Sequence, residues 1–293
     1  MTANLLLLLT AAIWGFGFVA QVIGMDYLKP FGFIGARFFL GAFSLLPVIW
    51  FFRRSLVSQP VSFGLLLQGS LLSGAILFAA SSFQQVGLLY TTASNAGFIT
   101  GMYMIFVPVI GLMLGVRTSL AVWLGCLIAC LGLFLLGVDE QWQVGYGDLL
   151  QLAGAALWAV HILAIDHYGR RVPGLLLAFG QFFVCSVLAA LVSGAVLGEG
   201  TTAEQLVQAG PTLVYAGIVT VGVAYTLQVI AQAKAHPAHA GIILSLEAVF
   251  GAVGGYWLLD ELLNSRQLMG CALMLIGMIV SQAFLVKSET NRG

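Results

Sequence analysis

Charged side chains are scarce in this sequence. Only 8% of the 293 residues are Asp, Glu, Lys or Arg, and 60% are apolar. Soluble domains carry roughly 25% charged residues, because their surfaces face water. The shortage of charge therefore excludes an ordinary soluble domain and predicts a protein that lies in a membrane.

Long polar stretches are also absent, as are the short alternating segments of a membrane β-barrel. A bilayer core about 30 Å thick requires about 20 apolar residues per helix. We therefore predict an all-α integral membrane protein. Its ten expected membrane-spanning helices lie at residues 5–23, 32–52, 64–84, 93–114, 119–138, 148–165, 174–197, 211–231, 240–259 and 267–286.

Sequence motifs of common enzymes are missing. The chain has no HExxH zinc motif, no GxSxG nucleophile motif and no Walker loop, so ATP-driven activity is unsupported. We expect no catalytic residue, no metal and no cofactor, while proton coupling stays open. Four cysteines lie inside predicted spans and are expected to be small buried residues: Cys126, Cys130, Cys185 and Cys271.

What the sequence does contain is an internal repeat with a shift of 144 residues. An odd number of helices repeated in tandem enters the membrane the second time from the opposite side, as in many secondary transporters. We therefore predict two inverted five-helix repeats at 1–138 and 148–286, a linker at 139–147 and a short cytoplasmic tail at 287–293. The recurring residues include Trp14 and Trp158, Phe38 and Phe182, Gln84 and Gln228, Gly97 and Gly241, and Phe106 and Phe250; after one inserted residue, Gly125 recurs as Gly270 and Gly132 as Gly277.

Lys and Arg residues are unevenly divided between the two sides of the predicted bundle. The side after each even-numbered span carries most of them, so by the positive-inside rule it faces the cytoplasm. We expect a multi-pass protein of the cytoplasmic (inner) cell membrane with both termini in the cytoplasm. The residues on that side are Arg53, Arg54, Arg117, Arg170, Arg171, Lys234, Lys287 and Arg292, against Lys29 and Arg266 on the other side.

Several short stretches occur in a specific order along the chain: residues 12–15 (AIWG), 30–39, 90–96 (YTTASNA), 107–108 (VP), 246–249 (LEAV) and 260–261 (DE). Together they resemble the EamA family of the drug/metabolite transporter superfamily. The resemblance implies export or import of small metabolites, often amino acids or related compounds. One departure is Ala248, where members often carry Pro, so a kink is expected at Pro108 more than in the ninth span.

Glu247 is the only acid near the middle of a predicted span, and Tyr103 is its counterpart in the first repeat. A buried acid in a membrane is costly and should face a cavity or a partner. We interpret Glu247 as a site for a cationic substrate group or a proton. The alternative is a glutamate whose hydrogen bonds are satisfied by neighbouring helices.

Arg37 lies about two turns into the second span, and its repeat counterpart is Gln181. Its guanidinium would neutralise Glu247 or bind a substrate carboxylate, or else extend to the outer interface. If Arg37 and Glu247 line one cavity, a zwitterion such as an amino acid fits the pair.

Trp14 and Trp158 lie near mid-span and are expected to form the aromatic wall of a small-molecule pocket. His161 shares the face of Trp158, either as a satisfied buried histidine or as a proton relay. Other polar residues near span ends are candidate gates, with helix capping and interfacial hydration as the alternative: Gln84, Gln85, Asn95, Tyr225, Gln228 and His239.

The favoured interpretation is a secondary transporter, most simply an exporter, that moves a small polar or amphipathic metabolite by alternating access. We expect the metabolite and the lipid bilayer as partners, no nucleic acid, and a monomer or homodimer. One alternative is an intramembrane aspartyl protease, because residues 145–148 read GYGD; that chemistry needs a second aspartate, which no neighbouring span supplies. The other is a non-transporting membrane bundle.

Overall fold

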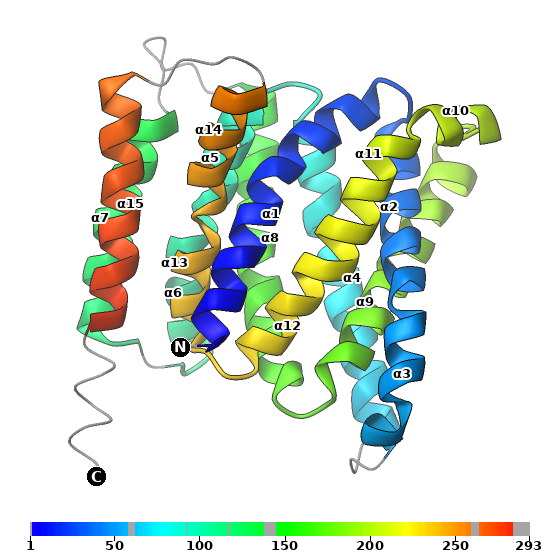
Figure 1. The fold of residues 1–293 in the computed structure, drawn as a ribbon, viewed down its shortest axis with the longest axis horizontal. Helices are drawn as coiled ribbons and strands as arrows, with labels where there is room; N and C mark the ends of the chain where they lie inside the picture. Colours follow the sequence, from blue (N-terminus) through cyan, green and yellow to red (C-terminus); the bar gives the residue numbers. More distant parts are fainter. Residues whose placement is uncertain are drawn as a thin grey trace.

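The computed structural model describes residues 2–57, 62–91, 93–116, 118–137, 145–258 and 264–283, and all regular structure in these ranges is helical (Figure 1). The first half contains α1 (Thr2–Met25), α2 (Pro30–Ser44), α3 (Leu46–Val57), α4 (Phe63–Gly87), α5 (Ala93–Gly101), α6 (Tyr103–Met113) and α7 (Leu120–Gly137). The second half contains α8 (Tyr146–Gly169), α9 (Gly174–Leu191), η1 (Val192–Val196), α10 (Ala203–Gln208), α11 (Gly210–Val214), η2 (Tyr215–Tyr225), α12 (Thr226–Gln232), α13 (Pro237–Leu244), α14 (Glu247–Leu258) and α15 (Ser265–Ala283).

Seven helical segments in the described ranges are long and apolar enough to cross a membrane. An eighth is formed if α2 and α3, which meet at an angle of 45°, make one span. Pro47 accounts for this bend, because its ring cannot donate a backbone hydrogen bond and crowds the preceding turn. Two shorter apolar helices lie at Leu120–Leu135 and Ser265–Ser281. The helical membrane fold is confirmed, and the total of ten spans stays a prediction.

The helices α7 and α15 stand side by side at one edge of the bundle (Figure 1). Glycines allow this close approach: a Cβ atom on Gly125 would meet the Gly277 carbonyl oxygen at 2.7 Å, and one on Gly132 would meet the Gly270 oxygen at 2.6 Å. Gly125 and Gly270 are repeat counterparts, as are Gly132 and Gly277. Each of these two contacts is therefore the counterpart of the other.

The centre of the bundle also brings repeat counterparts together. Phe38 of α2 and Phe182 of α9 are fully buried, and their ring centroids lie 6.1 Å apart. Around them α4 packs on α8 and α9, while α1 packs on η2 and α14. Both sequence halves thus contribute to one continuous core.

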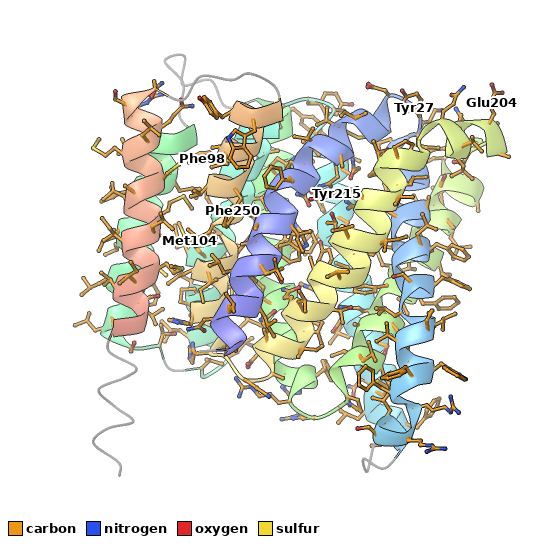
Figure 2. The ribbon with its side chains drawn as sticks, in the orientation of Figure 1. Tyr27, Phe98, Met104, Glu204, Tyr215 and Phe250 are labelled. Carbon is orange, nitrogen blue, oxygen red and sulfur yellow. The ribbon has the colours of Figure 1, made fainter. Side chains whose placement is uncertain are left out.

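The two ends of the bundle differ in charge. At the end where α2 begins, Glu199 accepts hydrogen bonds from the backbone N–H groups of Phe31 and Gly32, at 3.4 and 2.8 Å. Tyr27 and Glu204 lie at this same end (Figure 2). Arg170, Arg171 and Lys234 gather at the other end. Several residues behind the predicted orientation and linker lie outside the described residues: Arg117, Asp139, Glu140, Asp260, Glu261, Lys287 and Arg292.

Candidate functional site

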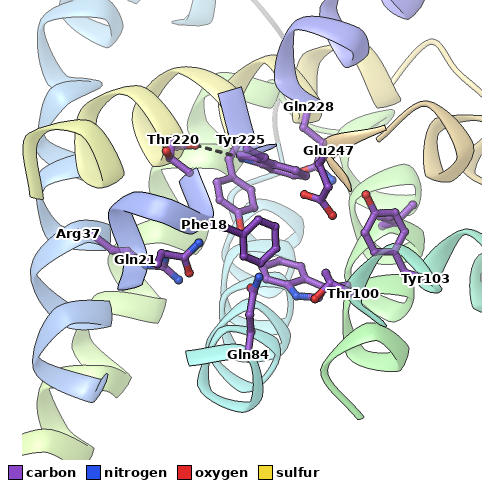
Figure 3. A pocket seen from close by; sticks show the side chains of 13 residues that line it. Phe18, Gln21, Arg37, Gln84, Thr100, Tyr103, Thr220, Tyr225, Gln228 and Glu247 are labelled. Atoms are coloured by element: carbon purple, nitrogen blue, oxygen red, sulfur yellow. Dashed lines mark hydrogen bonds between the residues drawn. The ribbon is translucent and has the colours of Figure 1, made fainter. Parts of the chain in front are cut away.

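A narrow cavity lies inside the bundle, between helices of both halves (Figure 3). Its volume is about 30 Å³, which is room for about two water molecules. The residues that line it are Trp14, Phe18, Gln21, Arg37, Gln84, Thr100, Tyr103, Trp158, Ile162, Thr220, Tyr225, Gln228 and Glu247.

Pairs of residues 144 positions apart dominate this lining. A wall made of such pairs is what two repeats related by a two-fold axis would build around that axis. The four pairs are Trp14 with Trp158, Phe18 with Ile162, Gln84 with Gln228, and Tyr103 with Glu247.

The two residues of the last pair each follow a tight turn within a membrane-spanning helix. Tyr103 is the first residue of α6, after α5 has ended at Gly101, and Glu247 is the first residue of α14, after α13 has ended at Leu244. At both breaks a tight hydrogen bond replaces the usual helical one: Ile105 N–H donates to the Met102 carbonyl at 2.9 Å, and Ala248 N–H to Ser245 at 3.1 Å. Tyr103 and Glu247 therefore each follow a tight turn within a continuous span and line the cavity.

Pro108 lies inside α6 and lacks the N–H group that would bond the carbonyl of Met104. The Cys126 thiol of α7 donates to that carbonyl instead, at an Sγ–O distance of 3.3 Å. In the second half, the Ser245 hydroxyl donates to the Ile242 carbonyl at 2.9 Å, which competes with the helical ladder near the α13–α14 break. The helix break in the second half therefore needs no proline.

Glu247 is buried, with 4% of its surface exposed. Its Oε1 atom and the Tyr103 hydroxyl have no hydrogen-bond partner that meets standard geometry among the described residues. The two groups lie beside each other at one side of the cavity and interact electrostatically (Figure 3). The carboxyl group thus has a polar neighbour and spare hydrogen-bonding capacity on the cavity side.

Arg37 is also buried, with 3% of its surface exposed, so its side chain does not reach the outer interface. Its guanidinium carbon lies 5.1 Å from the ring centre of Phe38 and 5.7 Å from that of Phe33. Nε and Nη2 have no hydrogen-bond partner among the described residues, and no ion pair joins Arg37 to Glu247 there. The predicted direct neutralisation of one by the other is therefore not what the structure shows.

Tyr225 lies between the charged side chains of Arg37 and Glu247 (Figure 3). Its hydroxyl interacts electrostatically with both Arg37 and Glu247. Its ring lies 4.5 Å from that of Trp14 and 6.0 Å from that of Trp158, measured between centroids. We placed Tyr225 among the gate candidates from sequence, whereas the structure puts it in the aromatic wall of the cavity.

His161 and Gln181 do not line the cavity. His161 Nε2 donates to Gln181 Oε1 at 2.9 Å, and both side chains are fully buried. The imidazole lies beside Tyr225, with ring centroids 6.4 Å apart, so this pair forms a polar layer behind the aromatic wall.

The remaining gate candidates divide into three groups. Gln84 and Gln228 line the cavity. Gln85 is buried away from it, with neither amide atom hydrogen-bonded among the described residues, and His239 lies on α13 with Nδ1 3.4 Å from the Ser281 hydroxyl. The side chain of Asn95 lies outside the described residues.

Five lining residues are not among the site residues predicted from the sequence, and one of them is Gln21, whose repeat counterpart is Ile165. Phe18 and Ile162 lie one helical turn beyond Trp14 and Trp158, so the repeat together with helical spacing would have found them. Thr100 and Thr220 have the apolar residues Leu244 and Ile76 as repeat counterparts and leave no such signal.

Asp148, the acid of the GYGD stretch, has both carboxylate oxygens engaged. Oδ1 accepts from the Thr91 hydroxyl at 2.5 Å, and Oδ2 accepts from the Gly145 N–H at 2.9 Å. The residue caps the start of α8, as expected for an acid at a helix N-terminus. The described residues contain no group of three or more His, Cys, Asp or Glu side chains that could hold a metal ion.

Comparison with known proteins adds independent information. The sequence profile of the EamA-like transporter family matches residues 1–138 and 145–282. Two proteins of Archaeoglobus fulgidus, each named an uncharacterized transporter, are similar to this chain: one is 32% identical over 292 residues, 95% of this chain and 85% of its own length. The other is 30% identical over 271 residues, 88% of this chain and 89% of its own length. A crystal structure with 18% identity aligns with a TM-score of 0.77 over 98% of both chains, which indicates a shared fold.

Proposed function

Because the chain belongs to the EamA-like transporter family, we propose that it moves a small zwitterionic metabolite, an amino acid or a related compound, by alternating access. It would act as a ten-span secondary transporter of the cytoplasmic membrane with both termini in the cytoplasm. Export is the proposed direction of transport.

The observation that carries this proposal is the placement of two buried charges in one cavity. Arg37 and Glu247 lie on different sides of it, with Tyr225 and Phe18 between them (Figure 3). Each has polar atoms without a partner among the described residues, and such buried groups are expected to find one. A ligand carboxylate on Arg37 and an ammonium group near Glu247 and the aromatic rings would satisfy both.

The small size of the cavity and the repeat pairs in its wall support alternating access. Small-molecule pockets measure on the order of 300–1,000 Å³, far more than the 30 Å³ of this cavity. The structure therefore supports a closed state that must widen to admit a ligand. The tight turns before Tyr103 and Glu247 are the proposed hinges in the cavity wall.

Proton coupling would use Glu247. A carboxyl group that lines the cavity can hold a proton in one state of the transport cycle and release it in another. When the cavity opens to water, the ionised form becomes accessible and the proton leaves. Binding of an ammonium group and binding of a proton at Glu247 would then exclude each other, which is the requirement for exchange.

The test is metabolite profiling of cells and medium with overproduced wild type, Glu247→Gln and Glu204→Gln at matched membrane levels. Glu204 lies exposed on α10 and serves as the control for loss of one acid. We expect a compound with both an ammonium and a carboxylate group to accumulate in the medium with wild type and control, and not with Glu247→Gln. Equal export by Glu247→Gln, with the same dependence on pH, would remove Glu247 from the mechanism.

A further inference from the structure

A second groove lies far from the cavity, at the end of the bundle where α3 and α12 end. Its volume is about 570 Å³. The apolar wall includes Val48, Phe52 and Ile230, which are 40, 50 and 41% exposed. Because this wall lies on the outside of a membrane-embedded bundle, it contacts lipid chains rather than protein.

Cations line the rim of this groove. Arg171 and Lys234 are exposed there, and neither pairs with an acid among the described residues. Arg171 Nη1 lies 2.8 Å from His167 Nε2. The neighbouring Arg170 is already occupied, because it donates to Asp166 at 2.7 Å and to the Ala235 carbonyl at 2.7 Å. The groove therefore offers two cations whose charge is not neutralised by the protein.

The fold itself does not require these cations. The positions 144 residues earlier, which are their repeat counterparts, carry Tyr27 for Arg171 and Tyr90 for Lys234. The counterpart of Arg170 is Asp26, an acid. The related helix ends at the opposite face lack these cations, as the positive-inside rule predicts for inverted copies, so the evidence for a ligand is the position of two cations, unpaired with any acid among the described residues, beside an apolar groove.

We propose that this groove binds one anionic phospholipid, with its phosphate between Arg171 and Lys234 and one acyl chain along Val48, Phe52 and Ile230. A lipid headgroup with net negative charge complements the two cations. A zwitterionic headgroup also carries a positive charge, which Arg171 and Lys234 would repel. The apolar wall favours a ligand with an acyl chain, and a free phosphate compound has no such chain.

The test is native mass spectrometry of the purified full-length protein, titrated with phosphatidylglycerol or phosphatidylcholine. Wild type is expected to retain one phosphatidylglycerol in preference to phosphatidylcholine. The double variant Arg171→Gln/Lys234→Gln should bind it about 30-fold more weakly, from the usual contribution of two cations at an anionic membrane surface. The control Arg53→Gln/Arg54→Gln removes the same charge from α3 outside the groove lining and should bind as wild type does.

The apolar half of the site has its own test. Ile230→Trp fills the groove without changing charge and should weaken phosphatidylglycerol binding, and glycerol phosphate should not compete. Thermal unfolding of each variant in detergent verifies that the bundle is intact. Equal retention of the two lipids by wild type, equal losses in the two double variants, or full binding by Ile230→Trp would each overturn the proposal.

Discussion

Arg37 has only 3% of its surface exposed, yet its Nε and Nη2 atoms have no hydrogen-bond partner among the described residues. A buried charge of this kind lowers stability, because desolvation is not offset by an acid partner. The sequence identified Arg37 and Glu247 from their depth in the spans. It could not show that the two do not touch, because helix rotation and the place of Tyr225 depend on packing.

Substitution of Arg37 separates a binding role from a structural one. Arg37→Gln copies the residue at its repeat counterpart, Gln181, and removes the uncompensated charge. We expect the melting temperature to stay the same or rise, while affinity for the substrate falls by about 30-fold or more, as for the loss of a buried charged hydrogen bond. Arg37→Lys keeps the charge but loses the planar two-point contact. Its affinity for the substrate should therefore lie between those of wild type and Arg37→Gln.

The measurements are thermal unfolding of the purified protein and uptake into proteoliposomes at a series of substrate concentrations. A variant that unfolds at a clearly lower temperature and binds substrate normally would identify Arg37 as a structural residue.

At the level of the helices, apolar runs located most of the spans, and interruptions within them were harder to foresee. Residues 93–114 and 240–259 were each expected as one helix, with a kink favoured at Pro108. The structure keeps a single span in each region, Ala96–Met113 and Pro237–Gly254, and adds a tight turn within the first at Met102 and within the second at residues 245–246. A serine hydroxyl bonded to its own helix has this effect locally, and hydropathy does not detect it.

The hydrogen bond from the Cys126 thiol of α7 to the Met104 carbonyl of α6 can be tested by substitution. Cys126→Ala should lower the free energy of unfolding by about 1 kcal/mol, because a buried carbonyl loses its donor. Cys126→Ser should retain most of the stability that Cys126→Ala loses, because the serine hydroxyl can donate to the same carbonyl. In Pro108→Ala the backbone N–H is restored, so the cysteine becomes dispensable, and Cys126→Ala should then cost little.

A double-mutant cycle on thermal unfolding in detergent measures this coupling. Additive effects of Pro108→Ala and Cys126→Ala would show that the thiol does not serve the carbonyl that proline leaves free.

For the whole molecule, the internal repeat was the most informative feature of the sequence. It predicted the pairing of Trp14 with Trp158 and of Tyr103 with Glu247, and the structure brings all four residues to one cavity. What it could not predict is the closed state, because a volume of 30 Å³ results from how the two halves rest against each other. Arg37 lines the cavity whereas its repeat counterpart Gln181 does not, an asymmetry that the repeat alone does not predict.

The central claim is that the cavity recognises a zwitterion through Arg37 and Glu247. It is tested most directly by counterflow in proteoliposomes with wild-type protein. The compound found by metabolite profiling would be compared with its N-acetyl derivative, which lacks the ammonium group, and with its methyl ester, which lacks the carboxylate. We predict exchange of the parent compound and strongly reduced exchange of both derivatives. Exchange of both derivatives at the rate of the parent would contradict the assignment of the two charges to substrate binding.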